Sequence, residues 1–206
     1  MWIYERKLQY PVNIKTPNPK LATIICTQLG GPDGELGASL RYLNQRFSMP
    51  NKEVIGTLTD IGTEELGHME MIASIVYQLT RNLSEKEVSE SPFASYFVDH
   101  TTGVYTVSAA GVPFDTKYLA VKGDPIADLN EDLAAEQKAR VTYDNILRLA
   151  DDPDVKDAIR FLRQRELVHY QRFAEALNKT RDGLDCNNYY ACNPAFDKGC
   201  GKMKNC

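Results

Sequence analysis

Four helical patterns, grouped in two pairs, constrain the fold of this chain more than any other feature of its sequence. Apolar residues recur at helical spacing in each pattern, whereas the stretch between the two pairs, 83–123, has no sustained helical period. That stretch is too long for a hairpin loop and is interpreted as a crossover connection. Two helices, a long crossover and two more helices is the order of ferritin-like four-helix bundles, so we predict this all-α fold. The four patterns cover about 18–47, 51–82, 124–150 and 152–183.

Local signals mark the ends of three of these helices. Asn51 is a favourable N-cap for the second helix. The Asp-Pro pairs at 124–125 and 152–153 each place a capping side chain before a proline at the first helical position. Gly183 favours the end of the fourth helix.

A glycine- and proline-rich cluster interrupts the first pattern. Such a cluster either kinks one helix or separates two. We expect one bent helix over 18–47. The cluster consists of Gly30, Gly31, Pro32 and Gly34.

Composition limits the domain count and the partners. A chain of 206 residues with 43% apolar content can bury one core, so we predict a bundle domain at 18–183, an extended strap at 1–17 and a tail at 184–206. The net charge of −4 gives no basic field for nucleic acid or an anionic membrane surface. No stretch has a signal-peptide core or approaches the roughly 20 apolar residues that span a bilayer. We therefore expect synthesis in the cytoplasm, with no nucleic-acid and no membrane partner.

The five cysteines fall into two groups. Cys26 stands alone in an apolar run, where a small buried hydrophobic side chain is much more common than a reactive thiol. The gaps between the other four do not match the paired Cys-x-x-Cys of zinc sites. Disorder, local disulfides and interchain crosslinks all remain open for the tail, which we expect to act in assembly and not in catalysis. Its cysteines are Cys186, Cys192, Cys200 and Cys206.

Two Glu-x-x-His units stand near the middle of long helices. Glu65 and His68 lie on the second helix, and Glu166 and His169 on the fourth. Residues three apart share one helix face, so each unit points in one direction. A single unit of this kind is usually solvated. Here two of the three histidines of the chain stand in this frame on the expected helices, which favours a shared site.

The other two helices each supply one more glutamate, Glu35 and Glu136. Two glutamates with two Glu-x-x-His units form the set that binds two iron or manganese ions in carboxylate bundles. Four buried carboxylates without partners would be strongly unfavourable, and two divalent ions would cancel their charge. The lack of thiolates in the set argues against structural zinc. Glu64 points about 100° away from Glu65, so it is either solvated or lies behind the ligands.

Five segments of the chain resemble the manganese catalases, and within that family the short forms associated with the spore coat of endospore-forming bacteria. They are ERKLQY near the start, LGGPDGELGASLRYLNQ, DIGTEELGHMEMI, IADLNEDLAAEQKAR and FLRQRELVHYQRF. Together they cover most of 5–175. The glycine-rich lead into Glu35 is far more specific than the bare set of acidic and histidine residues.

This resemblance implies that two manganese ions are bound and that hydrogen peroxide is disproportionated. It implies that Glu65 bridges the ions, that Glu166 moves protons rather than binding metal, and that Tyr42 hydrogen-bonds to the cluster. It also implies a homo-hexamer, and assembly into the spore coat with other coat proteins. The implied metal ligands are Glu35, Glu65, His68, Glu136 and His169.

The chain also departs from the family. The members taken as reference have an arginine just before the third-helix ligand, where this chain has Ala135. Arg140, one turn after Glu136, either supplies a charge on the same face or lies at the surface. We expect this change to affect rate and peroxide affinity more than the reaction itself.

Two alternatives to a manganese catalase remain open. The first is a di-iron ferroxidase or peroxidase of the same architecture, because iron accepts the same ligand types. The second is a mainly structural spore-coat protein in which the cluster only stabilises the fold.

Overall fold

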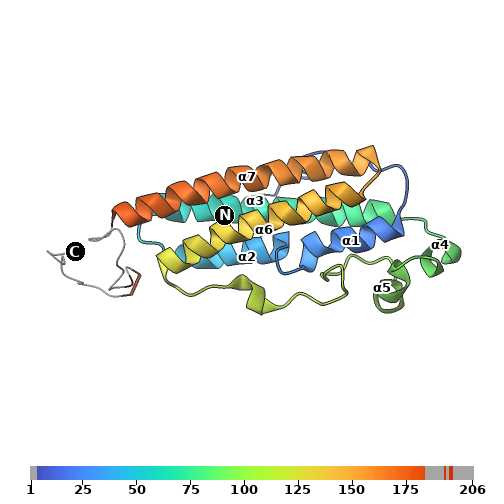
Figure 1. Ribbon diagram of the computed structural model, residues 1–206, viewed down its shortest axis with the longest axis horizontal. Helices are drawn as coiled ribbons and strands as arrows, with labels where there is room; N and C mark the ends of the chain where they lie inside the picture. Colours follow the sequence, from blue (N-terminus) through green and yellow to red (C-terminus); the bar gives the residue numbers. More distant parts are fainter. Residues whose placement is uncertain (1–3, 184–192, 194, 197–206) are drawn as a thin grey trace.

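The computed structural model describes residues 4–183, 193, 195 and 196, and these residues confirm the predicted all-α bundle. Helices α3, α6 and α7 lie side by side, and α1 and α2 together occupy the fourth position of the bundle (Figure 1). The long crossover runs from the end of α3 to the start of α6 across the outer side of α1 and α2. The bundle helices are α1 (Pro19–Gly30), α2 (Glu35–Gln45), α3 (Lys52–Thr80), α6 (Pro125–Leu149) and α7 (Pro153–Asp182).

The caps predicted from the sequence are confirmed. The side chain of Asn51 accepts a hydrogen bond from the backbone N–H of Val54 at 2.9 Å and begins α3. Asp124 and Asp152 cap α6 and α7 in the same way, each before a proline in the first turn. Gly183 is the C-cap of α7. These side chains satisfy backbone donors that have no partner inside the helix, and so fix where each helix begins.

The prediction of one bent helix over 18–47 is wrong, because α1 and α2 are separate helices. The chain leaves the helical conformation at Gly31, whose backbone N–H still bonds to the carbonyl of Thr27. The crossover passes directly against Gly30: a Cβ atom there would lie 2.2 Å from the carbonyl carbon of Thr106. Helix α2 then restarts at Glu35. The glycine-rich cluster therefore makes room for another segment instead of bending a helix.

The crossover at 83–123 contains more structure than its lack of period suggested. It holds two short helices, α4 (Glu85–Ser89) and α5 (Phe93–His100), the 3-10 turn η2 (Thr116–Leu119) and an isolated bridge between Val107 and Pro113. These helices are too short to show a clear period, and α4 depends on the reciprocal hydrogen bonds of a capping box between Ser84 and Glu87. A further 3-10 turn, η1 (Arg46–Ser48), follows α2.

Residues 4–17 form an extended segment that packs on the bundle of its own chain. Ile14 is buried, and its backbone N–H donates to the side chain of Gln78 on α3. The amide of Gln78 donates in turn to the carbonyl of Val12. The ring of Tyr10 stacks on Phe161 of α7, with ring centres 4.6 Å apart. We call residues 4–17 the N-terminal strap.

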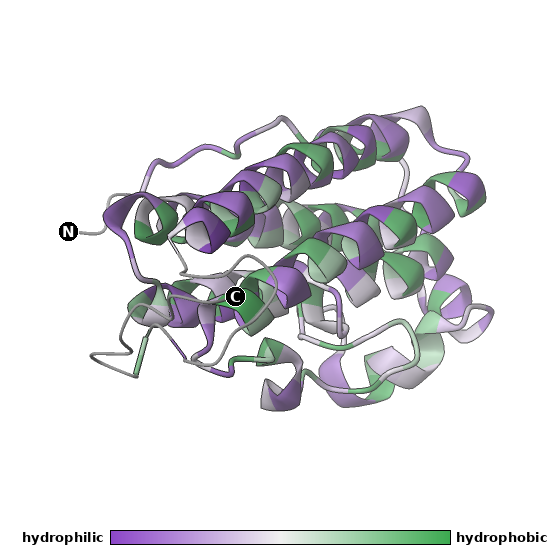
Figure 2. Ribbon diagram, turned by 60° about the vertical axis from the view of Figure 1, so that its left-hand side comes forward, coloured by the Kyte–Doolittle hydropathy of each residue, from purple (hydrophilic) through white to green (hydrophobic). Residues whose placement is uncertain are grey.

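The core consists of two apolar clusters at opposite ends of the bundle. One cluster includes residues of α1 and of the second half of α3, and the other includes residues of α2 and of the first part of α3. Green and purple alternate along each helix in Figure 2, as amphipathic helices require. Cys26 lies in the first cluster, where burial raises the pKa of its thiol to about 12, in agreement with a packing role.

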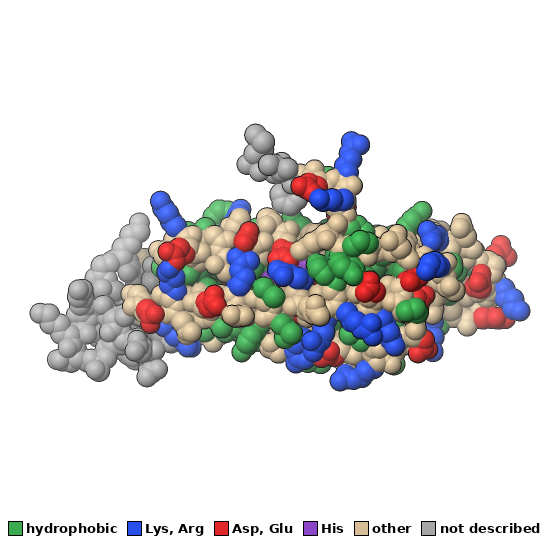
Figure 3. All heavy atoms as spheres, turned by 90° about the horizontal axis from the view of Figure 1, so that it is seen from above, with side chains coloured by type: hydrophobic (Ala, Val, Ile, Leu, Met, Phe, Trp, Pro, Cys, Tyr) green, Lys and Arg blue, Asp and Glu red, His purple; other side chains and the backbone are tan. Residues whose placement is uncertain are grey.

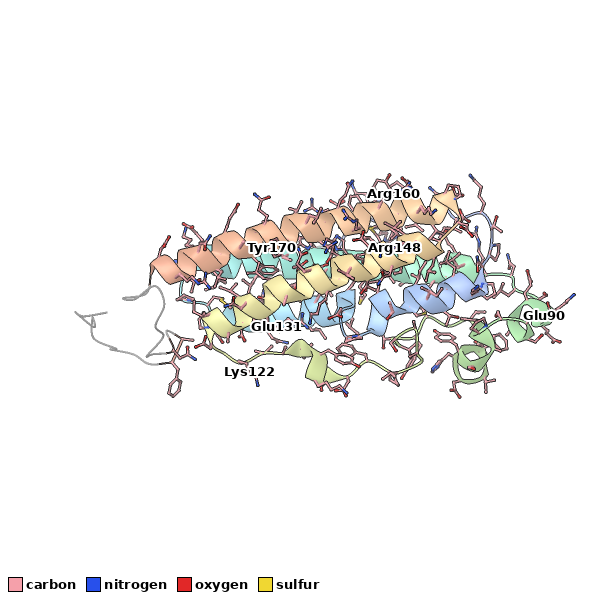
Figure 4. The ribbon with its side chains drawn as sticks, in the orientation of Figure 1. Glu90, Lys122, Glu131, Arg148, Arg160 and Tyr170 are labelled. Carbon is pink, nitrogen blue, oxygen red and sulfur yellow. The ribbon has the colours of Figure 1, made fainter. Side chains whose placement is uncertain are left out.

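The face of the molecule seen from above in Figure 3 carries charged side chains of both signs, with hydrophobic side chains between them. Arg148 on α6 and Arg160 and Tyr170 on α7, labelled in Figure 4, are exposed. Among the described residues, no helix has the length and apolar character needed to cross a bilayer. The tail cysteines, Cys186, Cys192, Cys200 and Cys206, lie outside the described residues.

Candidate metal centre

A group of buried acidic and histidine side chains separates the two apolar clusters. Every bundle helix except α1 contributes to this group. Helix α2 provides one glutamate at its first residue, α6 provides one at mid-length, and α3 and α7 each provide a Glu-x-x-His unit. All six side chains are at most 2% exposed. They are Glu35, Glu65, His68, Glu136, Glu166 and His169.

Glu65 lies between the two histidines. Its Oε2 atom is 2.7 Å from Nδ1 of His68, and its Oε1 atom is 2.8 Å from Nδ1 of His169. Two ligands bound at right angles to one ion, each about 2.1 Å from it, are separated by about 3 Å. The spacing on each side of Glu65 therefore suits a carboxylate that shares one ion with each histidine.

Glu35 and Glu136 complete two similar halves around Glu65. Oε2 of Glu35 is 3.9 Å from Nδ1 of His68, and Oε2 of Glu136 is 3.6 Å from Nδ1 of His169. Each half thus offers one imidazole nitrogen, one terminal carboxylate and one oxygen of Glu65. This arrangement brings together every residue that the sequence proposed as a metal ligand.

Glu166 lies close to the same group. One ligand atom from each of Glu65, His68, Glu166 and His169 can be chosen so that all four lie within 4.8 Å of one another. Its Oε1 atom is buried and has no hydrogen-bond partner. Burial first, and then repulsion from Glu35 and Glu136, raise the pKa of Glu166 well above its usual range. The structure thus places Glu166 beside the centre, and its role in proton transfer remains a prediction.

The polar atoms of the centre fit metal ions. Oε2 of Glu136 is buried without a hydrogen-bond partner, and Oε1 of Glu65 accepts no hydrogen bond although Nδ1 of His169 is close to it. Burial, followed by repulsion from Glu65, raises the pKa of Glu35 well above its usual range. Divalent cations among these groups would replace the missing hydrogen bonds and offset the repulsion between carboxylates. Carboxylates with imidazoles are ligands that manganese and iron accept.

Two tyrosines hydrogen-bond to the terminal glutamates in a crossed arrangement. The hydroxyl of Tyr42 on α2 donates to Glu136 on α6 at 2.5 Å. The hydroxyl of Tyr143 on α6 donates to Glu35 on α2. Sequence analysis proposed Tyr42 and missed Tyr143. The available signal was the spacing, because each tyrosine follows the glutamate of its own helix by seven residues, which is two helical turns.

The structure also locates three further positions that the sequence analysis discussed. Arg140 lies at the outside of the bundle, where Nη1 is 2.7 Å from Oδ2 of Asp144 and Nε donates to Gln137. It therefore adds no charge to the centre. Ala135 is 4% exposed and contributes no polar atom. Glu64, for which two placements were open, lies behind the histidines, with its side chain 13% exposed.

Comparison with known proteins places this chain in a family. The model of the family described as manganese containing catalase matches residues 1–186. Protein CotJC of Bacillus subtilis strain 168 is 53% identical over 90% of this chain and 97% of its own length. A probable manganese catalase of Clostridium acetobutylicum is 35% identical over 88% of this chain and 82% of its own length.

A solved structure has the same fold. The crystal structure of KatB, a manganese catalase from Anabaena, superimposes with a TM-score of 0.81 at 32% sequence identity. The similarity covers 87% of this chain and 80% of that chain. This chain and KatB therefore have similar sequences and the same arrangement of helices.

Proposed function

The chain belongs to the family of manganese-containing catalases, and we propose that it disproportionates hydrogen peroxide to water and oxygen at a dimanganese centre. The observation that carries the proposal is the placement of Glu65 between the two histidines, with one terminal glutamate beside each. We propose Glu65 as the bridging ligand. The other four ligands are Glu35, His68, Glu136 and His169.

The proposed reaction requires protons as well as electrons to be exchanged between two peroxide molecules. The peroxide that is oxidised to oxygen releases two protons and two electrons, and the peroxide that is reduced to two waters takes them up. Two bound manganese ions would supply the electron storage between these events. Both protons must also be held in the same interval, and a buried carboxyl group can hold one of them.

Glu166 is the group that we propose to hold this proton. Its carboxyl is buried beside the centre, and its raised pKa favours the protonated form near neutral pH. Oε1 has no other hydrogen-bond partner and is free to face substrate. Tyr42 and Tyr143 orient the terminal glutamates, because each tyrosine hydroxyl donates a hydrogen bond to one of these carboxylates.

Metal content and oxygen evolution measured on one purified sample test this function. Protein from manganese-supplied cells is expected to contain two manganese ions per chain and to release one oxygen for every two peroxides, without added reductant. Peroxide consumption only in the presence of an electron donor, with iron retained, would support the di-iron ferroxidase or peroxidase instead.

A structural role in the spore coat is the second candidate. Protein CotJC supports it, because that protein and this chain match over nearly their full lengths, whereas KatB extends beyond the match. We propose that the chain is made in the cytoplasm and assembles into the coat as a homo-hexamer. Antibody detection in coat extracts, and sedimentation of the purified protein, test location and assembly. A coat protein with two manganese ions and no oxygen evolution would favour the structural role.

A further inference from the structure

The residues that precede the two Glu-x-x-His units differ in charge and form an ion pair. Glu64 precedes Glu65 on α3, and Arg165 precedes Glu166 on α7. Nε of Arg165 donates to Oε1 of Glu64 at 2.7 Å, and Nη2 donates to Oε2 at 3.2 Å. This forked contact fixes the plane of the Glu64 carboxylate as well as its position.

The Glu64 carboxylate faces both histidines from the side opposite Glu65. Oε2 is 3.1 Å from Nε2 of His169, and Oε1 is 3.6 Å from Nε2 of His68. The two imidazole rings stack with their centres 5.5 Å apart at 21°, and both Nε2 atoms lie near the same Glu64 carboxylate. Each ring thus lies between Glu65 on its Nδ1 side and Glu64 on its Nε2 side.

We propose that Glu64 is a positioning residue shared by both histidines, which it orients with Nδ1 toward the metal ions. A carboxylate beside Nε2 favours the tautomer with its proton on that nitrogen and leaves the lone pair of Nδ1 for a metal. One carboxylate serving two histidines couples the two halves of the centre. The inference rests on the proposed ligand set and extends it.

The N-terminal strap helps to hold Glu64. Nε2 of Gln9 donates to Oε1 of Glu64 at 2.8 Å. Gln9 and Glu64 both line a groove of about 690 Å³ between the strap and α3. Glu64 therefore contacts the strap and lines the groove, and it also lies beside Nε2 of both histidines.

The substitution Glu64→Gln tests the proposal, with Asp60→Asn as its matched control. Glutamine keeps the size of the side chain, but its amide NH₂ faces one imidazole N–H as a second donor. Asp60 pairs with Arg172 at 2.7 Å, also between α3 and α7 and one turn from Glu64, and makes no contact with a histidine. Both variants lose one ion pair between the same two helices.

Retention of manganese by the loaded protein during titration with a chelator is the readout, together with the unfolding temperature of the metal-free protein. Glu64→Gln is expected to weaken manganese binding by about 10- to 100-fold, the usual range for a partner of a ligating histidine. Asp60→Asn is expected to bind manganese like the wild type. The unfolding temperatures of the two metal-free variants are expected to be similar.

Equal manganese retention by Glu64→Gln and the wild type would overturn the inference. So would an equal loss in both variants, because a general weakening of helix packing would then be the cause. If Glu64→Gln does not fold, Arg165→Lys replaces it: this variant keeps Glu64 and loses the fork, and unchanged retention would count against the proposal. Because oxygen evolution is not the readout, a wild-type protein that holds two manganese ions but is inactive refutes the proposed function alone.

Discussion

The two Glu-x-x-His units have the same spacing and opposite electrostatic surroundings. Burial by itself would raise the pKa of both glutamates. For Glu65, the neighbouring imidazoles of His169 and His68 more than offset burial, so its pKa is lowered. Beside Glu166, the carboxylates of Glu35 and Glu136 raise the pKa further.

The difference arises from what the neighbouring helices present to each unit. The Glu65 carboxylate reaches across to the histidine of the other unit, whereas the largest charge effects on the pKa of Glu166 come from the terminal glutamates Glu35 and Glu136. A short motif therefore places its two side chains on one helix face, while residues far away in the sequence decide which charges surround its glutamate. We expect substitutions at matched positions to separate the two roles.

Replacing either histidine should have the largest effect. His68→Ala and His169→Ala each remove one proposed imidazole ligand. The carboxylates that remain in that half would bind manganese too weakly, so we expect loss of bound manganese and of all oxygen evolution. Metal analysis and an oxygen electrode measure both. His100→Ala, on α5 and away from the centre, is the control and should keep its metal. Full metal content and rate in either variant would remove that histidine from the ligand set.

Exchanging the two glutamates for glutamine should sharpen the comparison. Glu166→Gln removes a group proposed to move protons, so both manganese ions should stay while turnover falls by about 10²-fold or more. Glu65→Gln removes the proposed bridge and should lose metal. Metal content before and after dialysis distinguishes the two variants. Loss of one ion from Glu166→Gln would instead make Glu166 a ligand.

Removing the tyrosine hydroxyls should have the smallest effect. Tyr42→Phe and Tyr143→Phe each take one hydrogen bond from a terminal glutamate, and we expect each to lower turnover by about tenfold with both metals retained. The two variants should resemble each other, because the contacts are crossed between α2 and α6. Tyr170→Phe, at an exposed site on α7, is the control. A large effect of one tyrosine alone would show that the two halves of the centre work differently.

Signals between neighbouring residues were sufficient to predict most of the bundle. Asn51, Asp124 and Asp152 each cap a helix through a hydrogen bond to a backbone N–H no more than three residues away. The break between α1 and α2 was not predictable in this way. It depends on the approach of Thr106 to Gly30, a contact between distant parts of the chain.

The centre shows the same division. Spacing on single helices identified the six buried acidic and histidine residues, and Tyr143 was available from the same spacing as Tyr42. The placement of Glu64 depends on its contacts with Arg165 and His169 of α7, which cannot be predicted from the sequence of α3. The positions of these residues on their helix faces could be predicted, whereas the partners of Glu64 on α7 required the structure.

The close approach of Gly30 to the crossover constrains the order in which the chain folds. Helix α2 begins at Glu35, only five residues after Gly30, where Thr106 and Val107 pass, so Glu35 lies close in sequence to a contact with that distant segment. Contacts between residues so far apart in the sequence form slowly, because a long loop must close first. His169 lies later still in the chain. A chain that ends before α7 lacks this proposed ligand, so the six-residue centre is complete only after α7 has been made.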